Sequence, residues 1–290
     1  ELPEWDGIDR VSALARRVSE NPLWEKGFRI WMLGMTAQWM GVMGDHANSV
    51  APLLISTEQG YFKSTFCKSL LPPVLRRYYM DKVDLTSQGN MERRLAEMGL
   101  LNLDEFDKFP PAKMPLLKNL MQMASLSLCK AYQKNYRVLP RIASFIGTSN
   151  RKDLLTDPTG SRRFICVEVE HPIDCEAIEY EQLYAQLKTA ILSGQRYWFT
   201  KEEEQELQKS NLSFYRQGPV EDVLRACYRS AEKGEESELL SAADIFQCLK
   251  KKNPAAMRGA NPASLAQVLV AVGIERKHTK FGNVYRVIPV

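Results

Sequence analysis

The residues best suited to chemistry follow a short apolar run. Leu53-Leu54-Ile55 is followed by a turn and then by Lys63-Ser64-Thr65, which begins a predicted helix. In a strand, turn and helix of this kind, backbone N–H groups hold phosphate oxygens, the Lys adds a positive charge and the Ser hydroxyl reaches Mg²⁺. We therefore expect a bound nucleotide here. The expected cofactor-binding residues are Gln59, Gly60, Lys63, Ser64 and Thr65, and Ser64 is also expected to contact the metal.

The loop departs from the usual phosphate-binding pattern at two positions. The pattern G-x-x-x-x-G-K-[ST] has Gly where this chain has Thr57 and Phe62, and Gly60 is only a partial substitute. A β-carbon at position 62 is expected to crowd a loop whose backbone must approach phosphate, and a positive φ there would add strain. Phe62 therefore weighs against hydrolysis, and against nucleotide binding as well.

Two further predicted strands end in polar residues of the right kind. The apolar run at 100–103 is followed by Asp104 and Glu105, and the run at 143–148 is followed by Ser149 and Asn150. Asp104 would help to hold Mg²⁺, and Glu105 would orient or deprotonate an attacking water. Asn150 would hold the γ-phosphate or that water. The alternative for the acidic pair is a solvated end of a strand.

A pair of arginines follows the third strand. Arg162 and Arg163 come directly after a Thr159-Gly160-Ser161 turn, and two adjacent guanidinium groups suit a phosphate supplied from elsewhere. Ordinary surface ion pairing is the alternative. These features follow one another in the chain: the loop, the acidic strand end, Asn150 and the arginine pair. Their order predicts a nucleotide-binding core.

Helical and strand-like stretches alternate around these residues. Apolar residues recur at helical spacing after Pro22, and short apolar runs end at polar residues further on. This alternation predicts an α/β sheet with both faces covered. Gly218-Pro219 is the clearest candidate for a domain boundary. We expect a helical segment over 1–50, an ATPase core over 51–217 and a separate domain over 218–290.

A basic stretch with interleaved tyrosines precedes the Asn150 strand. Its residues are Lys130, Tyr132, Lys134, Tyr136, Arg137 and Arg141. Cations with interleaved aromatic rings suit a single-stranded backbone and its bases, so we expect a DNA-binding hairpin that includes Lys130, Lys134 and Arg137. A solvated edge hairpin is the alternative.

The last part of the chain predicts three helices followed by a β-hairpin, which is typical of a winged helix. We expect a helix over about 220–231, one after Ser241 that runs through Lys250, and one that begins at Asn261-Pro262. From residue 240 onward there are eight bases and two acids. The expected DNA contacts here are Lys250, Lys251, Lys252, Arg276, Lys277 and Lys280. A basic face on a protein-docking module is the alternative.

Several of these strings together resemble the virulence-associated protein E (VirE) family. They are Trp5-Asp6-Gly7-Ile8-Asp9-Arg10, Gln59-Gly60-x-x-Lys63-Ser64-Thr65-Phe66, Leu103-Asp104-Glu105-Phe106-Asp107, Gly147-Thr148-Ser149-Asn150 and Thr159-Gly160-Ser161-Arg162-Arg163-Phe164. The family consists of P-loop ATPases of phages and mobile elements, similar to superfamily 3 primase-helicases.

The resemblance implies an AAA+-like P-loop NTPase core with ATP and Mg²⁺ as cofactors. Lys63 and Ser64 take the Walker A roles, Asp104 and Glu105 the Walker B roles, and Asn150 the sensor role. Arg162 and Arg163 are arginine-finger candidates. A homo-oligomeric ring, with a hexamer favoured, and a primase or replication module outside this chain are also implied.

Composition limits the remaining possibilities. No run of about 18 apolar residues is present, so no membrane span is expected. The six cysteines are scattered without a CxxC pair, which favours a reducing, cytoplasmic setting over a zinc or disulfide framework. Two functions remain open: an ATP-dependent DNA helicase or translocase with a degenerate loop, and a non-hydrolysing nucleotide- and DNA-binding assembly factor.

Overall fold

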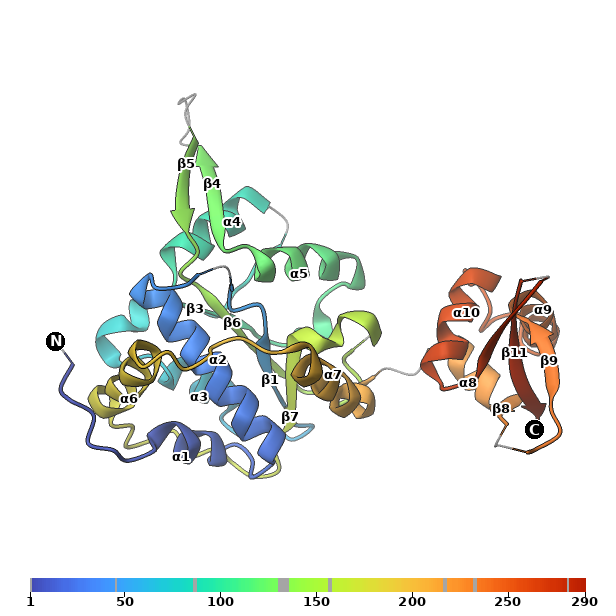
Figure 1. The fold of residues 1–290 in the computed structure, drawn as a ribbon, viewed down its shortest axis with the longest axis horizontal. Coiled ribbons are helices and arrows are strands. Elements are labelled where there is room, and N and C mark those ends of the chain that lie inside the picture. Colours follow the sequence, from blue (N-terminus) through green and yellow to red (C-terminus); the bar gives the residue numbers. More distant parts are fainter. Residues whose placement is uncertain are drawn as a thin grey trace. The chain divides into compact units, whose positions relative to one another are not determined.

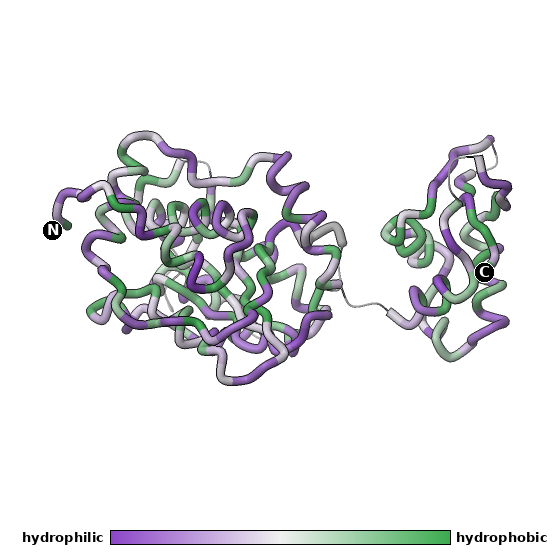
Figure 2. The backbone as a smooth tube through the Cα atoms, turned by 90° about the horizontal axis from the view of Figure 1, so that it is seen from below, coloured by the Kyte–Doolittle hydropathy of each residue, from purple (hydrophilic) through white to green (hydrophobic). Residues whose placement is uncertain are grey.

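The computed structural model describes residues 2–44, 46–85, 88–129, 136–155, 158–215, 218–231, 234–280 and 282–290. The chain forms two compact units, Glu1–Tyr215 and Arg216–Val290. Residues before 51 are part of the first unit, since Trp24 and Phe28 share a core with Leu54 and Ile146. In Figure 2 the tube changes between apolar (green) and polar (purple) stretches in both units, as expected for elements with one buried side.

A five-stranded parallel sheet forms the centre of the first unit (Figure 1). Its strands are β1 (Ala51–Ile55), β2 (Tyr79–Met80), β3 (Leu100–Leu103), β6 (Ser144–Ser149) and β7 (Phe164–Glu168), in the order β2-β3-β6-β1-β7. The register pairs Leu53 with Gly147 and Leu101 with Phe145. An added β-carbon at Gly147 would lie 2.6 Å from a methyl carbon of Leu53. A side chain at position 147 would therefore force its neighbours in the middle of the sheet to shift.

Both faces of the sheet are covered, as the sequence predicts. The helices are α1 (Arg10–Arg16), α2 (Pro22–Met40), α3 (Lys63–Ser69), α4 (Gln88–Glu97), α5 (Met114–Gln122), α6 (Tyr180–Leu192) and α7 (Lys201–Ser210), with short 3₁₀ turns η1 (Pro73–Tyr78), η2 (Phe106–Lys108), η3 (Pro111–Lys113), η4 (Pro158–Arg163) and η5 (Asn211–Phe214). Leu54 packs with α1, α2, α3 and α6. Its neighbour Leu53 packs with α4 and α5 on the other face. Strand residues thus alternate between two apolar cores.

Two helices of the first unit begin at clear capping residues. The Asn21 side chain accepts from the backbone N–H groups of Leu23 and Trp24 at the start of α2, and Pro22 is the first helical residue. Thr200 and Glu203 form a capping box at the start of α7. The apolar residues at helical spacing in α2 are buried, among them Trp24, Phe28, Trp31 and Met35.

The predicted hairpin before β6 is present as an antiparallel ribbon. Strand β4 (Ser125–Cys129) pairs with β5 (Tyr136–Pro140), and Figure 1 shows the ribbon projecting from the rest of the unit. Arg137 is exposed on β5, whereas Lys130 and Lys134 lie outside the described residues.

Arg141 corrects the sequence prediction, because it does not belong to an exposed basic hairpin. Its side chain is fully buried at the root of the ribbon. It donates to the backbone carbonyls of Ala143 at 2.7 Å and Asn48 at 2.9 Å, and to those of Leu120, Met121 and Met123. Burial lowers the pKa of Arg141 to about 9, so the guanidinium remains protonated at neutral pH.

The second unit combines three helices with a small antiparallel sheet. Its elements are α8 (Pro219–Arg225), β8 (Tyr228–Ser230), β9 (Glu238–Ser241), α9 (Ala242–Lys252), α10 (Pro262–Ala271), β10 (Arg276–Thr279) and β11 (Gly282–Pro289). Ser241 and Asn261 cap α9 and α10 as predicted. The helix expected over about 220–231 is shorter, because the chain enters β8 at Tyr228 and pairs there with Pro289. Among the described residues of either unit, no helix is long and apolar enough to cross a bilayer.

Candidate functional site

A hollow of about 340 Å³ lies where three neighbouring strands end. Because β3, β6 and β1 are adjacent and parallel, the residues that follow them meet at one edge of the sheet. We call it the Lys63 hollow. Its lining is Gln59, Gly60, Tyr61, Phe62, Lys63, Ser64, Thr65, Asp104, Glu105, Thr148 and Asn150. The structure therefore brings together all eight residues that the sequence predicts around a nucleotide and its metal, apart from the arginine pair.

Lys63 is the buried cation of the hollow. Its side chain is at the start of α3 and only 8% of the residue is exposed. The ammonium donates to the carbonyl of Ser56 at 3.2 Å and to Oδ1 of Asn150 at 3.2 Å. Burial lowers the pKa of Lys63, and the charges of Asp104 and Asp107 oppose that effect. The ammonium is held at the floor of the hollow by neutral oxygens.

Asp104 joins the start of α3 to the neighbouring strand ends. Its Oδ1 accepts from the Ser64 hydroxyl at 2.8 Å and from the Thr148 hydroxyl at 2.6 Å. Carboxylate and hydroxyl oxygens are the ligands that Mg²⁺ prefers. The Ser64 and Asp104 oxygens therefore fit such a metal. The sequence analysis named Thr148 only as part of a motif and gave it no role. Its hydrogen bond to Asp104 positions that carboxylate.

Glu105 follows Asp104 and has a left-handed backbone, with φ at 50°. This turn leads directly into η2, which starts at Phe106. The Glu105 carboxylate pairs with the Lys108 ammonium one turn later, and its side chain is 45% exposed. It is therefore accessible at the hollow while Lys108 holds it.

Asp107 is a site residue that sequence reasoning missed. Its Oδ1 accepts from the Ser149 hydroxyl at 2.9 Å and from the backbone N–H of Asn150 at 3.3 Å. It thereby fixes the end of β6, from which the Asn150 side chain reaches Lys63. The only indication in the sequence was an additional acid two residues after Glu105.

Phe62 occupies the strained conformation that the sequence analysis anticipated. Its φ is 58°, in the left-handed region that favours Gly, and its carbonyl accepts from the backbone N–H of Phe66 at 2.8 Å. For a residue with a β-carbon this conformation costs roughly 1–2 kcal/mol. However, the residue is 54% exposed, so its ring lies at the rim of the hollow and does not crowd the interior of the loop. Gly60 also has a positive φ, 81°.

The first unit matches a known protein family. The model of the virulence-associated protein E-like (VapE-like) domain matches residues 1–216. The chain belongs to the VapE-like family. The resemblance found in its motifs is therefore confirmed. A second model, for a domain of unknown function described from a B. theta gene, matches residues 217–287. No curated protein sequence matches the chain.

Similar solved structures come from the C-terminal region of NrS-1. The apo structure of its residues 305–718 has 13% identity and a TM-score of 0.48, and the match covers all of this chain and 77% of that one. The A form apo structure of the same region has 13% identity and a TM-score of 0.47, with 78% of that chain covered.

The arginine pair lies at the opposite edge of the VapE-like sheet. Arg162 and Arg163 end η4, just before β7, and the first residue of β7 pairs with Ala51 at the start of β1. A five-residue strand spans about 16 Å, so these arginines do not reach the Lys63 hollow of their own chain. Arg162 pairs with Glu204 at 3.4 Å, and Arg163 donates to the carbonyl of Lys118 at 2.6 Å.

The predicted DNA contacts of the second unit are all on its surface. Lys250, Lys251 and Lys252 form the last turn of α9, and Arg276, Lys277 and Lys280 belong to β10 and the turn after it. Cations at the end of α9 also interact favourably with the helix dipole, so their position alone does not require a ligand.

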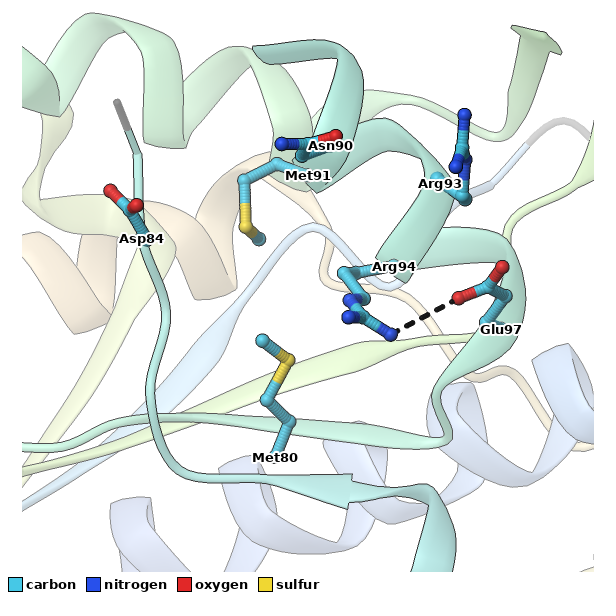
Figure 3. Close-up of a pocket in the computed structure, with 7 residues that line it drawn as sticks. All are labelled: Met80, Asp84, Asn90, Met91, Arg93, Arg94 and Glu97. Carbon is cyan, nitrogen blue, oxygen red and sulfur yellow. Dashed lines mark hydrogen bonds and ion pairs between the residues drawn. The ribbon is translucent and has the colours of Figure 1, made fainter. Parts of the chain in front are cut away.

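Another hollow of about 400 Å³ lies beside α4, where Met80 and Met91 face it (Figure 3). Arg94 and Glu97 form an ion pair at 3.3 Å at its edge. Its lining includes none of the sequence-predicted site residues.

Proposed function

We propose that the VapE-like unit binds Mg-ATP in the Lys63 hollow and hydrolyses it as a DNA helicase or translocase, in the replication of a phage or mobile element. One observation supports this most strongly. Lys63 and Ser64 begin α3, Asp104 follows β3 and Asn150 follows β6, yet all four line one hollow, where Lys63 bonds to Asn150 and Ser64 to Asp104. Membership of the VapE-like family is consistent with it.

Each side chain has a defined role in this proposal. Lys63 neutralises phosphate charge, and Ser64 with Asp104 holds Mg²⁺. When bound, the metal neutralises charge on the phosphates. Glu105 takes the proton of the attacking water, and Asn150 orients that water or the γ-phosphate. Thr148 and Asp107 position Asp104 and Asn150.

The core is proposed to be AAA+-like and to form a homo-oligomeric ring, with a hexamer favoured. Arg162 or Arg163 then completes the hollow of a neighbouring subunit, because neither reaches the hollow of its own chain. An arginine supplied in this way is worth about 10³-fold or more in turnover.

DNA contacts are proposed for the ribbon, through Arg137, and for the second unit, through its basic residues. The second unit is proposed to be winged-helix-like, and its three helices and β10–β11 hairpin support this proposal. Exposed Lys and Arg side chains suit phosphate contacts, which depend on charge and not on sequence.

One observation favours a second candidate, a non-hydrolysing nucleotide- and DNA-binding assembly factor. Phe62 holds the left-handed position next to Lys63, where a glycine would let phosphate approach more closely. An ATPase assay with single-stranded DNA distinguishes the two. Turnover that DNA stimulates and Glu105→Gln abolishes supports the enzyme. Nucleotide binding without turnover supports the assembly factor.

A further inference from the structure

A second hollow, of about 640 Å³, lies at the opposite edge of the first unit's sheet. Residues 46–50, which lead into the start of β1, form one wall. Residues 197–201, which lead into α7, form another, and Gln122 at the end of α5 completes it. We call it the His46 hollow. Its volume is in the range that small ligands occupy.

Flat aromatic rings dominate one side of this hollow. The rings of His46 and Trp198 are stacked, with centroids 4.1 Å apart and planes 11° from parallel. Trp198 in turn meets Tyr197 edge-on, at 5.1 Å and 85°. The Tyr197 hydroxyl accepts from the backbone N–H of Gly44 at 2.9 Å, which fixes that ring. His46 is exposed, so an aromatic plane held from behind faces the hollow.

Two polar side chains in the same hollow have hydrogen-bonding capacity to spare. Gln122 and Ser49 make no side-chain hydrogen bond to any residue that the structure describes. The lining contains one cation, Lys201, and one anion, Glu204, and Glu204 pairs with Arg162 outside the lining. A nearly neutral hollow with a flat aromatic wall and an amide suits an uncharged planar ring that has donors and acceptors on its edge.

The hollow is also linked to the root of the β4–β5 ribbon. Arg141, the first residue after β5, donates to the carbonyl of Asn48 at 2.9 Å. Gln122 lies three residues before the start of β4. The His46 hollow therefore adjoins the root of the ribbon.

We propose that the His46 hollow binds a nucleobase, stacked on His46 and hydrogen-bonded to Gln122 and Ser49. The base belongs either to a single strand of DNA or to a free nucleoside. This site does not depend on the Lys63 hollow, so it stands or falls separately from ATP binding. Base–aromatic stacking of this kind is sequence-tolerant.

The test uses the full chain and two probes. One is adenosine, which has no phosphate for Lys63 to bind, and its binding is followed by saturation-transfer NMR. The other is a short single-stranded oligonucleotide with one 2-aminopurine, whose fluorescence reports stacking. The variants are His46→Ala, His46→Phe and Gln122→Ala. His171→Ala is the matched control, because His171 is also exposed but follows β7 at the other edge of the sheet.

We expect His46→Ala to weaken binding of at least one probe by about 5- to 100-fold and to remove the 2-aminopurine response. His46→Phe should retain much of the binding, because phenylalanine keeps a flat ring at this position. Gln122→Ala alone should also weaken binding. His171→Ala should leave the binding of both probes unchanged. Response to the oligonucleotide alone identifies DNA as the source, and response to adenosine alone identifies a free nucleoside. If neither probe binds, or if both bind His46→Ala and Gln122→Ala as they bind the original chain, the proposal is wrong.

Discussion

The ammonium of Lys63 donates to Oδ1 of Asn150 at 3.2 Å and thereby joins the start of α3 to the end of β6. These residues are 87 positions apart in the sequence, and neither has an acidic side chain as its partner in this contact. A buried ammonium with neutral oxygen partners is available to an anion. In the proposed function, phosphate binds at this contact, so nucleotide affinity should depend on the protonation of Lys63.

Nucleotide affinity should fall as the pH rises, and earlier than an exposed lysine would allow. Burial lowers the pKa of Lys63 below its ordinary value of 10.5. The ammonium therefore loses its proton at a lower pH than that of an exposed lysine. Asp104 and Asp107 face Lys63 and partly restore its pKa. Asp107→Asn removes one attraction, so the loss of affinity should begin at lower pH. Calorimetry of ADP binding between pH 7 and 10, with circular dichroism as a check on folding, measures it.

The control for that experiment is Asp222→Asn, the same change on α8 in the other unit. It should leave the pH profile where it was. An Asp107→Asn profile that coincides with that of the unaltered chain would show that the Asp107 charge does not act on Lys63.

Phe62→Gly should raise nucleotide affinity or turnover several-fold. Glycine adopts the observed φ of 58° without the cost of a β-carbon, and it opens the rim of the Lys63 hollow. Phe62→Ala separates the two effects, because it removes the ring but keeps the β-carbon. Steady-state turnover and calorimetric affinity are measured for all three chains. If Phe62→Gly lowers both, the ring is a fitted part of the site and the steric argument fails.

Arg141→Met should destabilise the first unit by about 3 kcal/mol or more, since it leaves several buried carbonyls without a donor. Thermal unfolding should then occur roughly 10 °C lower. Arg137→Met is the matched control, because Arg137 is exposed on the same ribbon, and its unfolding temperature should change little. Equal effects of the two substitutions would contradict the assignment of Arg141 as a buried anchor.

Two inactive variants should restore activity when mixed. A chain with Arg162→Ala and Arg163→Ala keeps its Lys63 hollow, and a Glu105→Gln chain keeps its arginines. Because the arginines lie at the other edge of the sheet, only a neighbouring subunit can combine the two intact parts. Recovery should rise with protein concentration, as assembly does. Mixtures that stay inactive beside an active original chain, with only monomer in sedimentation, would rule out the ring.

The sequence predicts the Lys63 hollow well because its chemistry lies at strand ends. Apolar runs locate β1, β3 and β6 to within a residue or so, and parallel pairing then brings Lys63, Asp104 and Asn150 to one edge. The two-residue strand β2 was missed, because so short an edge strand has almost no periodicity.

Tertiary contacts explain what the sequence did not predict. Arg141 looked like one more cation of a basic hairpin, and only the fold shows that backbone carbonyls surround it. The role of Asp107 depends on a left-handed turn at Glu105, which no local sequence pattern predicts. The stacking of His46 on Trp198 joins positions 152 apart in the chain, so the spacing of residues in the sequence does not predict it.

The proposed function requires that Mg-ATP bind in the Lys63 hollow. The most direct test is calorimetric titration of Mg-ATP into the full chain, beside Lys63→Ala, Asp104→Ala and the control Lys68→Ala, which changes an exposed lysine on the same helix. We expect binding by the unaltered chain and by Lys68→Ala, with loss of binding in Lys63→Ala and Asp104→Ala while their unfolding temperatures show a retained fold. No binding by the unaltered chain at millimolar Mg-ATP, or equal binding by all four, would contradict the account.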